Sequence, residues 1–380
     1  MLDFPSSGAK MHLIFHTITM QLEHKPDFEE AKTAWRHFWA RETWKRPLVT
    51  GWVPRDPKNP LPWEETPLHL AYYRKMKEGW ASYSKRIDAY LESTIFPAEA
   101  IPMLSPDLGP DQFAAFLGPE LQFSEGSPDT NWIHPVVEDW DAFDFRLEPK
   151  NPSWVFAQDL ARKLADHARG RYLVSTGDLH SNADALSALR NPELLCMDFL
   201  DEPEKVCRAM QKVRKMYQPI YNGLYEAAGR NVETGTIVWL PTWSDGKFAV
   251  VQCDFICMVS CEIAREFIIP ALEEETAFLD HAIYHLDCPG ALRHLDDILS
   301  IKGIHAIEWV SGAGQKPMWQ WTDVLKKCQA AGKSLIIEWV SCEEVKQVHR
   351  ELDPAGVVYS VSAQSLAEIE DLCAWLEKNT

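Results

Sequence analysis

Residues 305–341 read HAIEWVSGAGQKPMWQWTDVLKKCQAAGKSLIIEWVS, a β-strand pattern, a helix pattern and a second strand pattern in succession. The runs His305–Val310 and Leu335–Val340 are short, apolar and rich in β-branched side chains. Met318–Ala331 between them has helical spacing and follows Gly and Pro. Two strands joined by a helix crossover are parallel neighbours, so this stretch predicts one unit of an α/β fold.

Outside this unit the same alternation continues. Further strands are predicted at Leu48–Val53, Ala100–Leu104, Tyr172–Gly177, Thr236–Leu240, Ala282–Asp287 and Val357–Ser362. Further helices are predicted at Ala291–Ile301, Glu343–Leu352 and Leu366–Lys378. Eight strands with helices between them predict a single (β/α)8 TIM barrel. We expect residues 1–45 to form an N-terminal helical extension and residues 46–380 to form the barrel domain. Helices at Leu68–Leu91 and Glu202–Ala228, with residues 125–154, read as insertions and covering loops.

The composition excludes several classes of function. The net charge is −18 and no Lys/Arg run occurs, which argues against nucleic acid or an anionic membrane as a partner. Met11–Met20 is the early apolar stretch, and it lacks the length and basic flank of a signal or spanning segment. Nine Cys form no CxxC pair, which indicates reduced thiols and a cytoplasmic location. No GxGxxG, Walker or GxSxG motif occurs, so nucleotide hydrolysis and serine-hydrolase chemistry are not expected.

Polar residues at the carboxyl ends of strands are the candidates for a barrel active site. His285 and Asp287 lie two apart on one strand and therefore point to the same side, with Cys288 next to them. These residue types suit Zn²⁺, so the three are a candidate metal site. The alternative is that His285 and Asp287 hydrogen-bond to each other or to a substrate.

Glu308 and Glu338 end two neighbouring strands, where two carboxyl groups can divide acid and base roles. Each is followed by Trp, and adjacent strand residues face opposite ways. If both Glu side chains point inward, Trp309 and Trp339 are expected to face the helices as core.

Other candidates follow or precede the remaining strands. Asp254 is a candidate catalytic carboxylate, and the candidate substrate-binding residues are Asp178, His180, Trp243, Arg46 and Arg55. Cys253, Cys257 and Cys261 have the spacing of one helix face, for which core packing is the favoured interpretation.

Several of these segments together resemble the uroporphyrinogen decarboxylase superfamily, in particular its corrinoid-dependent methyltransferase branch. The segments that carry the resemblance are Arg46-Pro-Leu-Val49, Leu104 to Gly118, Asp178-Leu-His180, Gln252-Cys-Asp-Phe255, Tyr284 to Asp296 and Ala306 to Gly314. The resemblance implies the barrel fold, a methyl group moved between a small methylated substrate and a corrinoid on a separate partner protein, a zinc ion, and a possible homodimer.

Two departures from the family pattern narrow this expectation. The Arg-rich substrate motif of the decarboxylases is replaced by Gly51-Trp-Val-Pro-Arg-Asp56, which argues against tetrapyrrole decarboxylation. The methyltransferase His-x-Cys motif keeps His285 but has Asp287 in place of Cys, and residues 360–363 near the last strand contain no Cys. A metal site would need Cys288, Glu338 or Cys342 to complete it.

Three hypotheses follow from the sequence. The first is the corrinoid-dependent methyltransferase. The second is a metal-free lyase or hydrolase that acts on a small carboxylated or glycosidic substrate through Asp254, Glu308 and Glu338. The third is a binding protein that keeps the barrel without its chemistry.

Overall fold

The computed structural model describes residues 21–124, 126–230 and 233–380. Residues 1–20 of the predicted extension at residues 1–45, which include Met11–Met20, lie outside the described residues. The described part of the extension contains helix α1 (Phe28–Trp39). The buried side of this helix includes Trp35 and Phe38. None of the helices within the described ranges combines the length and the apolarity needed to cross a membrane.

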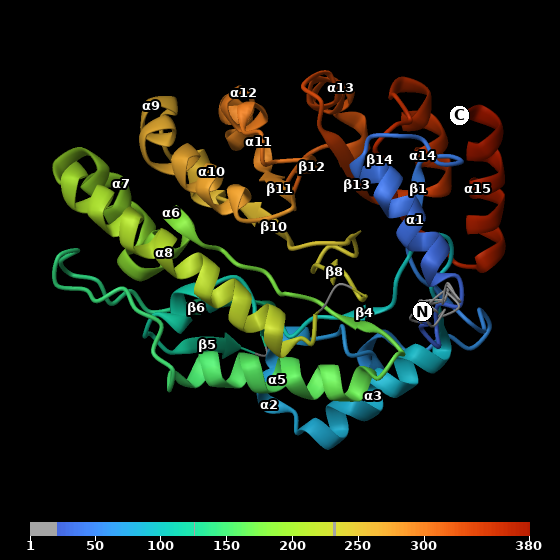
Figure 1. Ribbon diagram of the computed structural model, residues 1–380, viewed down its shortest axis with the longest axis horizontal. Helices are drawn as coiled ribbons and strands as arrows, with labels where there is room; N and C mark the ends of the chain where they lie inside the picture. Colours follow the sequence, from blue (N-terminus) through green and yellow to red (C-terminus); the bar gives the residue numbers. More distant parts are fainter. Residues whose placement is uncertain (1–20, 125, 231–232) are drawn as a thin grey trace, which may run out of the picture.

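The centre of the molecule is a parallel sheet of six strands in the order β1-β14-β13-β12-β11-β10. Its strands are β1 (Leu48–Thr50), β10 (Phe248–Gln252), β11 (His281–Asp287), β12 (Ala306–Val310), β13 (Ser334–Ser341) and β14 (Val357–Ser362). Helices form an outer layer beyond these strands (Figure 1). They are α10 (Ile269–Ala277), α11 (Cys288–Ala291), α12 (Leu295–Ser300), α13 (Thr322–Ala330), α14 (Cys342–Val348) and α15 (Leu366–Asn379).

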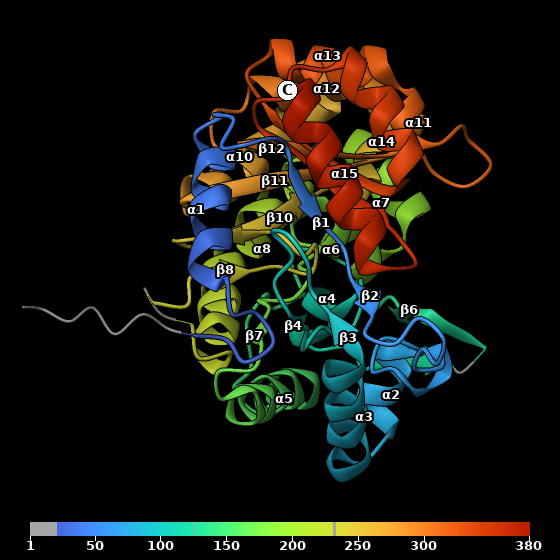
Figure 2. The same ribbon diagram turned by 90° about the vertical axis from the view of Figure 1, so that its right-hand side faces the viewer.

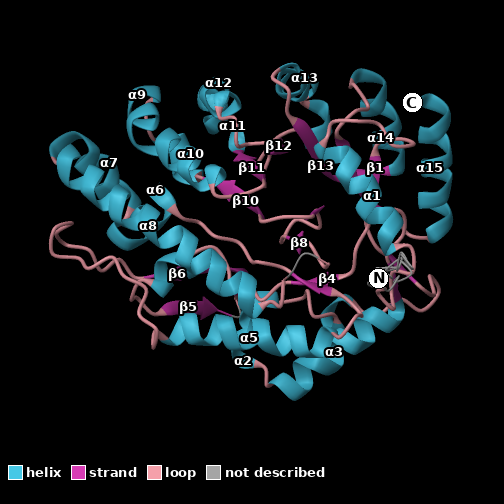
Figure 3. Cartoon of the chain, in the orientation of Figure 1, coloured by secondary structure: helices cyan, strands magenta, loops and turns pink. Residues whose placement is uncertain are grey.

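A second region, built from the first half of the chain, lies below this sheet in the view of Figure 2. It contains α2 (Ala71–Lys77), α3 (Trp80–Ser93), α4 (Gln112–Phe116) and α5 (Pro152–Ala168), with β2 (Val53–Pro54), β3 (Thr94–Ile95), β4 (Met103–Leu104), β5 (Leu121–Ser124), β6 (Ser127–Ile133) and β7 (Leu173–Val174). The chain then continues through α6 (Asn182–Arg190), α7 (Pro192–Asp201), α8 (Pro203–Ala227), β8 (Thr236–Ile237), β9 (Trp243–Ser244) and α9 (Cys261–Ile263). Figure 3 shows that this half is mostly helix and loop.

The expected α/β fold with a parallel sheet is confirmed, but the described residues do not form a closed eight-stranded ring of hydrogen bonds. Strands β4 and β7 pair in parallel as a separate sheet, and β8 pairs with β9. The predicted strands at Ala100–Leu104, Tyr172–Gly177 and Thr236–Leu240 each contain two strand residues. The sixth strand of the central sheet is β10, which the sequence interpretation had left within a loop.

Both faces of the central sheet are buried, as in other parallel sheets covered by helices. Alternate residues point to opposite faces: Ile337 packs in the outer core under the helices, whereas Ile336 belongs to an inner cluster. The inner cluster also takes Leu173 of β7 and Ile237 of β8, and Trp35 of α1 packs into it. Side chains from the separate strand pairs therefore meet those of the six-stranded sheet in one apolar core.

Candidate active site

The inner face of the sheet changes from apolar to polar near the carboxyl ends of its strands. The inner apolar layer contains Val250, Ile283, Ala306, Ile336 and Val358. Two residues farther along the same strands, and therefore on the same face, stand Gln252, His285, Glu308, Glu338 and Ser360. The strand register places Gln252 beside His285 and His285 beside Glu308. We call these five residues the polar row.

Two carboxyl groups and an imidazole interact within the polar row. His285 Nδ1 lies 2.6 Å from Glu308 Oε2. The carboxyl of Glu338 hydrogen-bonds to the carboxyl of Glu308 and to the hydroxyl of Ser360. The Glu308 side chain is 2% exposed. Burial raises the pKa of Glu338 well above its usual range, and the neighbouring Glu308 charge raises it further. Both effects favour the protonated, neutral form of Glu338.

Burial alone would lower the pKa of His285, but the Glu308 carboxylate outweighs it and raises that pKa to about 9. This raised pKa favours the imidazolium form of His285 at neutral pH. Such an arrangement can donate a proton from Glu338 while the hydrogen bond with His285 holds Glu308 in place.

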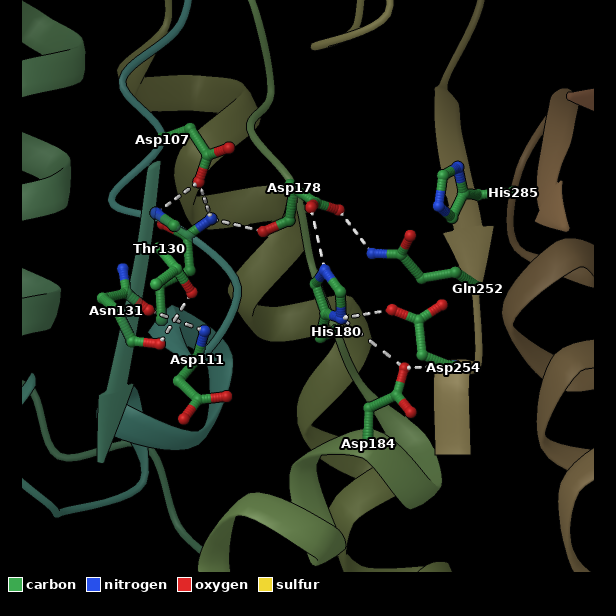
Figure 4. A network of polar contacts seen from close by, with 12 residues as sticks. Asp107, Asp111, Thr130, Asn131, Asp178, His180, Asp184, Gln252, Asp254 and His285 are labelled. Atoms are coloured by element: carbon green, nitrogen blue, oxygen red, sulfur yellow. Dashed lines mark hydrogen bonds and ion pairs between the residues drawn. The ribbon is translucent and has the colours of Figure 1, made fainter. Parts of the chain in front are cut away.

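A second polar cluster surrounds His180 (Figure 4). His180 Nε2 lies 3.0 Å from Asp178 Oδ2, and its Nδ1 lies 3.6 Å from Asp184 Oδ2 and 3.9 Å from Asp254 Oδ2. Burial lowers the pKa of His180, but Asp178 and Asp184 overcome this and raise it well above the usual value. Burial and the charge of Asp184 raise the pKa of Asp254 to about 6.

Side-chain amides connect this cluster to its neighbours. Gln252 Nε2 of the polar row donates to Asp178 Oδ1 at 2.7 Å. Gln112 Nε2 donates to Asp107 Oδ1 at 2.5 Å and also to the main-chain oxygen of Asp178. Burial, with the nearby Asp178 charge, raises the pKa of Asp107 to about 6. The ends of β4, β7 and β10 thus contribute to one continuous hydrogen-bonded network.

A cavity of about 980 Å³ opens beside the polar row and is bordered by Glu338, Ser360 and Asp107. This volume is at the upper end of the range typical of ligand sites. Its walls are largely aromatic and contain Trp52, Trp63, Tyr72, Tyr83, Tyr90, Phe96, Trp239 and Trp339. The two histidines are connected to residues that line the cavity by hydrogen bonds. His285 is connected to Glu338 through Glu308. His180 is connected to Asp107 through Asp178 and Gln112.

Trp339 corrects the expectation that both Trp residues of the repeated motif are core. Trp309 is 2% exposed and packs under the helices, as expected. Trp339 is 75% exposed, has a φ of 57° and lines the cavity. The pairing of β13 with β14 shifts between Ile337 and Val340, so an extra residue is inserted there and Trp339 turns outward.

The candidate metal ligands do not gather as zinc ligands would. Cys288, with a φ of 62°, hydrogen-bonds through its side chain to Cys257. Across the described ranges no three His, Cys, Asp or Glu side chains form a group that could hold a metal ion. His285, Asp287 and Cys288 do not fit a zinc site in this arrangement, so we assign no step to a metal, and zinc stays a prediction for elemental analysis of the protein.

Three candidate substrate-binding residues belong neither to the polar row nor to the cluster around His180, and they do not line the cavity: Arg46, Arg55 and Trp243. Arg46 Nη1 pairs with Glu99 Oε2 at 2.8 Å. Arg55 donates to the main-chain oxygens of Glu92 and Thr94. Trp243 is 1% exposed in the inner cluster, against Phe28 of α1.

The Cys spacing also gives a different result from the one expected. Cys253 follows β10, Cys257 lies in the 3₁₀ turn Asp254–Met258, and Cys261 begins α9. The three therefore do not share one helix face. Cys253 is buried, in agreement with a packing role.

Several residues of the site were missed from the sequence. Asp107, Gln112, Asp184 and Gln252 were given no role, although the network depends on them. Asp107 comes three residues after the predicted strand that ends at Leu104, and a carboxylate at that place is a detectable pattern. The amides Gln112 and Gln252 carry no pattern of their own.

The likeness of this chain to known proteins is one of fold. No family model matches the chain, and no curated protein sequence matches it. A solved structure described as a methyltransferase from Methanosarcina mazei is similar, with a TM-score of 0.56 over 92% of this chain and 98% of that chain. The two sequences are 11% identical, so the likeness concerns the fold.

Proposed function

We propose that this chain is a methyltransferase-like enzyme that binds a methylated small molecule in the aromatic cavity. The observation that carries the proposal is the buried Glu338 carboxyl at the wall of the cavity, hydrogen-bonded to Glu308, which in turn contacts His285. The fold likeness to a methyltransferase supports it. The resemblance of the sequence to the uroporphyrinogen decarboxylase superfamily points the same way.

We also propose that β4 and β7, which pair in parallel, complete a (β/α)8-type barrel with the six-stranded sheet. The shared inner cluster supports this, because Leu173 of β7 packs with residues such as Ile283 and Ile336 on the inner face. The polar row then stands where barrel enzymes carry their chemistry, at the carboxyl ends of the strands.

Glu338 supplies the proton that the reaction needs. When a methyl group leaves an oxygen or nitrogen atom, the bond to that atom breaks and its electron pair stays with the substrate. A proton from the Glu338 carboxyl then neutralises the departing group, which is general acid catalysis. The new Glu338 carboxylate faces Glu308, so the shared network of His285 and the two carboxyls favours its return to the acid form.

The methyl acceptor in this proposal is a reduced cobalt corrinoid carried by a separate protein. The reduced cobalt would supply the electron pair for the new bond to the methyl group. This chain would orient the donor and exclude water through the aromatic walls of the cavity.

The test is incubation of the protein under anaerobic conditions with cob(I)alamin and, in turn, aryl methyl ethers, N-methyl amines and methyl sulfides. The proposal predicts donor-dependent loss of the cob(I)alamin absorbance and release of the demethylated donor. If none of these donor classes consumes free or carrier-bound cob(I)alamin, the proposal is wrong.

A second candidate is a metal-free lyase or hydrolase, which the same Glu308–Glu338 pair would also serve. It differs in one measurable respect: turnover of a small carboxylated or glycosidic substrate would proceed with no corrinoid present and would resist chelators.

A further inference from the structure

Lys75, on α2, is a buried cation at the wall of the cavity. The residue is 7% exposed, and its Nζ donates to the main-chain oxygen of Asp107 at 2.6 Å. Nζ also lies 5.4 Å from the centre of the Tyr72 ring. No carboxylate oxygen of the described residues lies within salt-bridge distance of it, although Asp107 contributes attraction from farther away.

A buried ammonium is costly unless its donors are satisfied. Lys75 has three N–H donors and makes one hydrogen bond to the residues that the structure describes. Burial lowers its pKa to about 8, which still leaves it mostly charged at neutral pH. The mechanism proposed above does not use this charge.

Two other donors border the same cavity without a protein partner in the described residues. They are the hydroxyl of Tyr83, a residue that is 2% exposed, and the indole Nε1 of Trp239. Burial raises the pKa of Tyr83, so its hydroxyl keeps its proton. An unpaired buried donor costs about 1–3 kcal/mol, so each of these groups gains if a ligand supplies an acceptor.

We propose that Lys75 and Tyr83 form a carboxylate-binding subsite and that the ligand of the cavity is a flat, apolar molecule bearing one carboxylate. The flat body suits the aromatic walls, and the carboxylate supplies the acceptors that the buried donors lack. The reaction of this ligand rests on the proposed function, whereas its binding does not.

The charges around the cavity agree with this choice. Burial and the Glu308 charge raise the pKa of Glu338, at the wall, well above its usual range, which favours its neutral form and weakens its repulsion of an anion. Asp107 turns Oδ1 toward Gln112 and the main-chain nitrogen of Gly109. An aromatic cavity also attracts cations, but the Lys75 ammonium opposes them. A cationic ligand is therefore the competing outcome.

Calorimetric titration with three probes of one shape tests the subsite: 2-naphthoate, 2-naphthamide and 2-naphthylmethylammonium. The wild-type protein should bind the carboxylate at least about ten-fold more tightly than the amide, the scale of one charge-assisted hydrogen bond. This preference should fall as the pH rises through about 8, because Lys75 then loses its proton.

The variants Lys75→Met and Tyr83→Phe locate the effect. The preference for the carboxylate should vanish in Lys75→Met and weaken in Tyr83→Phe, whereas Lys77→Met, an exposed lysine on the same helix, should keep it. Equal binding of carboxylate and amide by the wild-type protein, tighter binding of the ammonium probe, or no binding of any probe at millimolar concentration would each overturn the proposal. Carboxylate-selective binding without methyl transfer to cob(I)alamin would count against the proposed function alone.

Discussion

At the scale of single residues, the chemistry depends on which carboxyl group holds a proton. Glu308 and Glu338 have the same side chain and neighbouring positions, yet their surroundings differ. Glu308 has the His285 ring at 2.6 Å, whereas Glu338 has Glu308 itself and the Ser360 hydroxyl. The imidazolium stabilises one charge, and that charge destabilises a second one nearby. The proton therefore belongs on Glu338.

Replacing Glu308 tests this pairing. In Glu308→Gln the main group that raises the pKa of His285 is removed, so burial opposes only the weaker attraction of Asp254 and Asp178, and the pKa should fall from about 9. NMR titration of the imidazole signals measures this change, with the signal of the exposed His134 as internal reference. A His285 signal that titrates near pH 9 in both proteins would contradict the assigned pair.

The sequence could identify part of this chemistry. The two Glu residues were found because each ends a predicted strand, and His285 was found for the same reason. Their partnership could not be found, because the pairing of His285 with Glu308 depends on the register between β11 and β12. Lys75 was missed because a lone lysine in a helix with other cations reads as exposed surface.

At the scale of elements, the second half of the chain was the predictable one. Strands β11 to β14 and the helices after them follow the expected pattern, because long parallel strands need continuous apolar runs. The short β4, β7 and β8 give weak patterns, and β10 was missed although Phe248–Gln252 is fully buried. The inserted residue in β13 was also not predicted from the sequence, because tryptophan is not a residue type that favours the left-handed backbone found at Trp339.

The insertion in β13 leads to a prediction on stability. Trp339 has a φ of 57°, which costs a residue with a Cβ atom about 1–2 kcal/mol and costs glycine little. Trp339→Gly should therefore be more stable than Trp339→Ala by about that amount in urea unfolding. At the exposed Glu370 of helix α15, glycine should instead be the less stable of the same two substitutions. If alanine is the more stable residue at both positions, the backbone at Trp339 is not strained.

The contact between α10 and the start of α6 leads to a prediction on pH dependence. Glu275 is 3% exposed and accepts from Ser181 Oγ at 2.6 Å, and burial raises its pKa to about 8. A folded-state pKa above the unfolded one gives stability at low pH that is lost as the pH rises through about 8.

Glu275→Gln should remove this contribution. Between pH 6 and pH 9 the wild-type protein should lose about 1–3 kcal/mol more unfolding free energy than the variant, the scale of a buried group left charged. The neighbouring Glu274 is about half exposed, and Glu274→Gln should behave like the wild-type protein. Parallel pH dependence of all three proteins would show that Glu275 does not titrate in this range.

At the scale of the whole molecule, the site is assembled from parts that are distant in the sequence. Asp107, Asp178 and Gln252 lie in three different strand–helix units. Gln112 donates to Asp107 and Asp178, and Gln252 donates to Asp178 directly. A parallel sheet brings its carboxyl strand ends to one edge, so the approximate place of the site follows from the fold class. The choice of partners depends on loop geometry and could not be read from one sequence.

The whole-molecule likeness to a methyltransferase and the chemistry of the polar row are independent observations. The first concerns the fold and covers 92% of this chain. The second concerns a carboxyl group of raised pKa at the wall of a large aromatic cavity. The proposed function rests on both observations, and in it Glu338 is the acid that protonates the demethylated donor.

The most direct measurement is the pH dependence of donor-driven cob(I)alamin consumption by the wild-type protein and by Glu338→Gln. We predict a loss of rate by about 10²–10⁴-fold in the variant, the usual contribution of a general acid. We also predict an alkaline decline in the wild-type protein that the variant lacks, while Glu343→Gln, an exposed carboxyl of α14, behaves like the wild-type protein. Equal rates and equal pH profiles for the wild-type protein and Glu338→Gln would contradict the central claim that Glu338 delivers the proton.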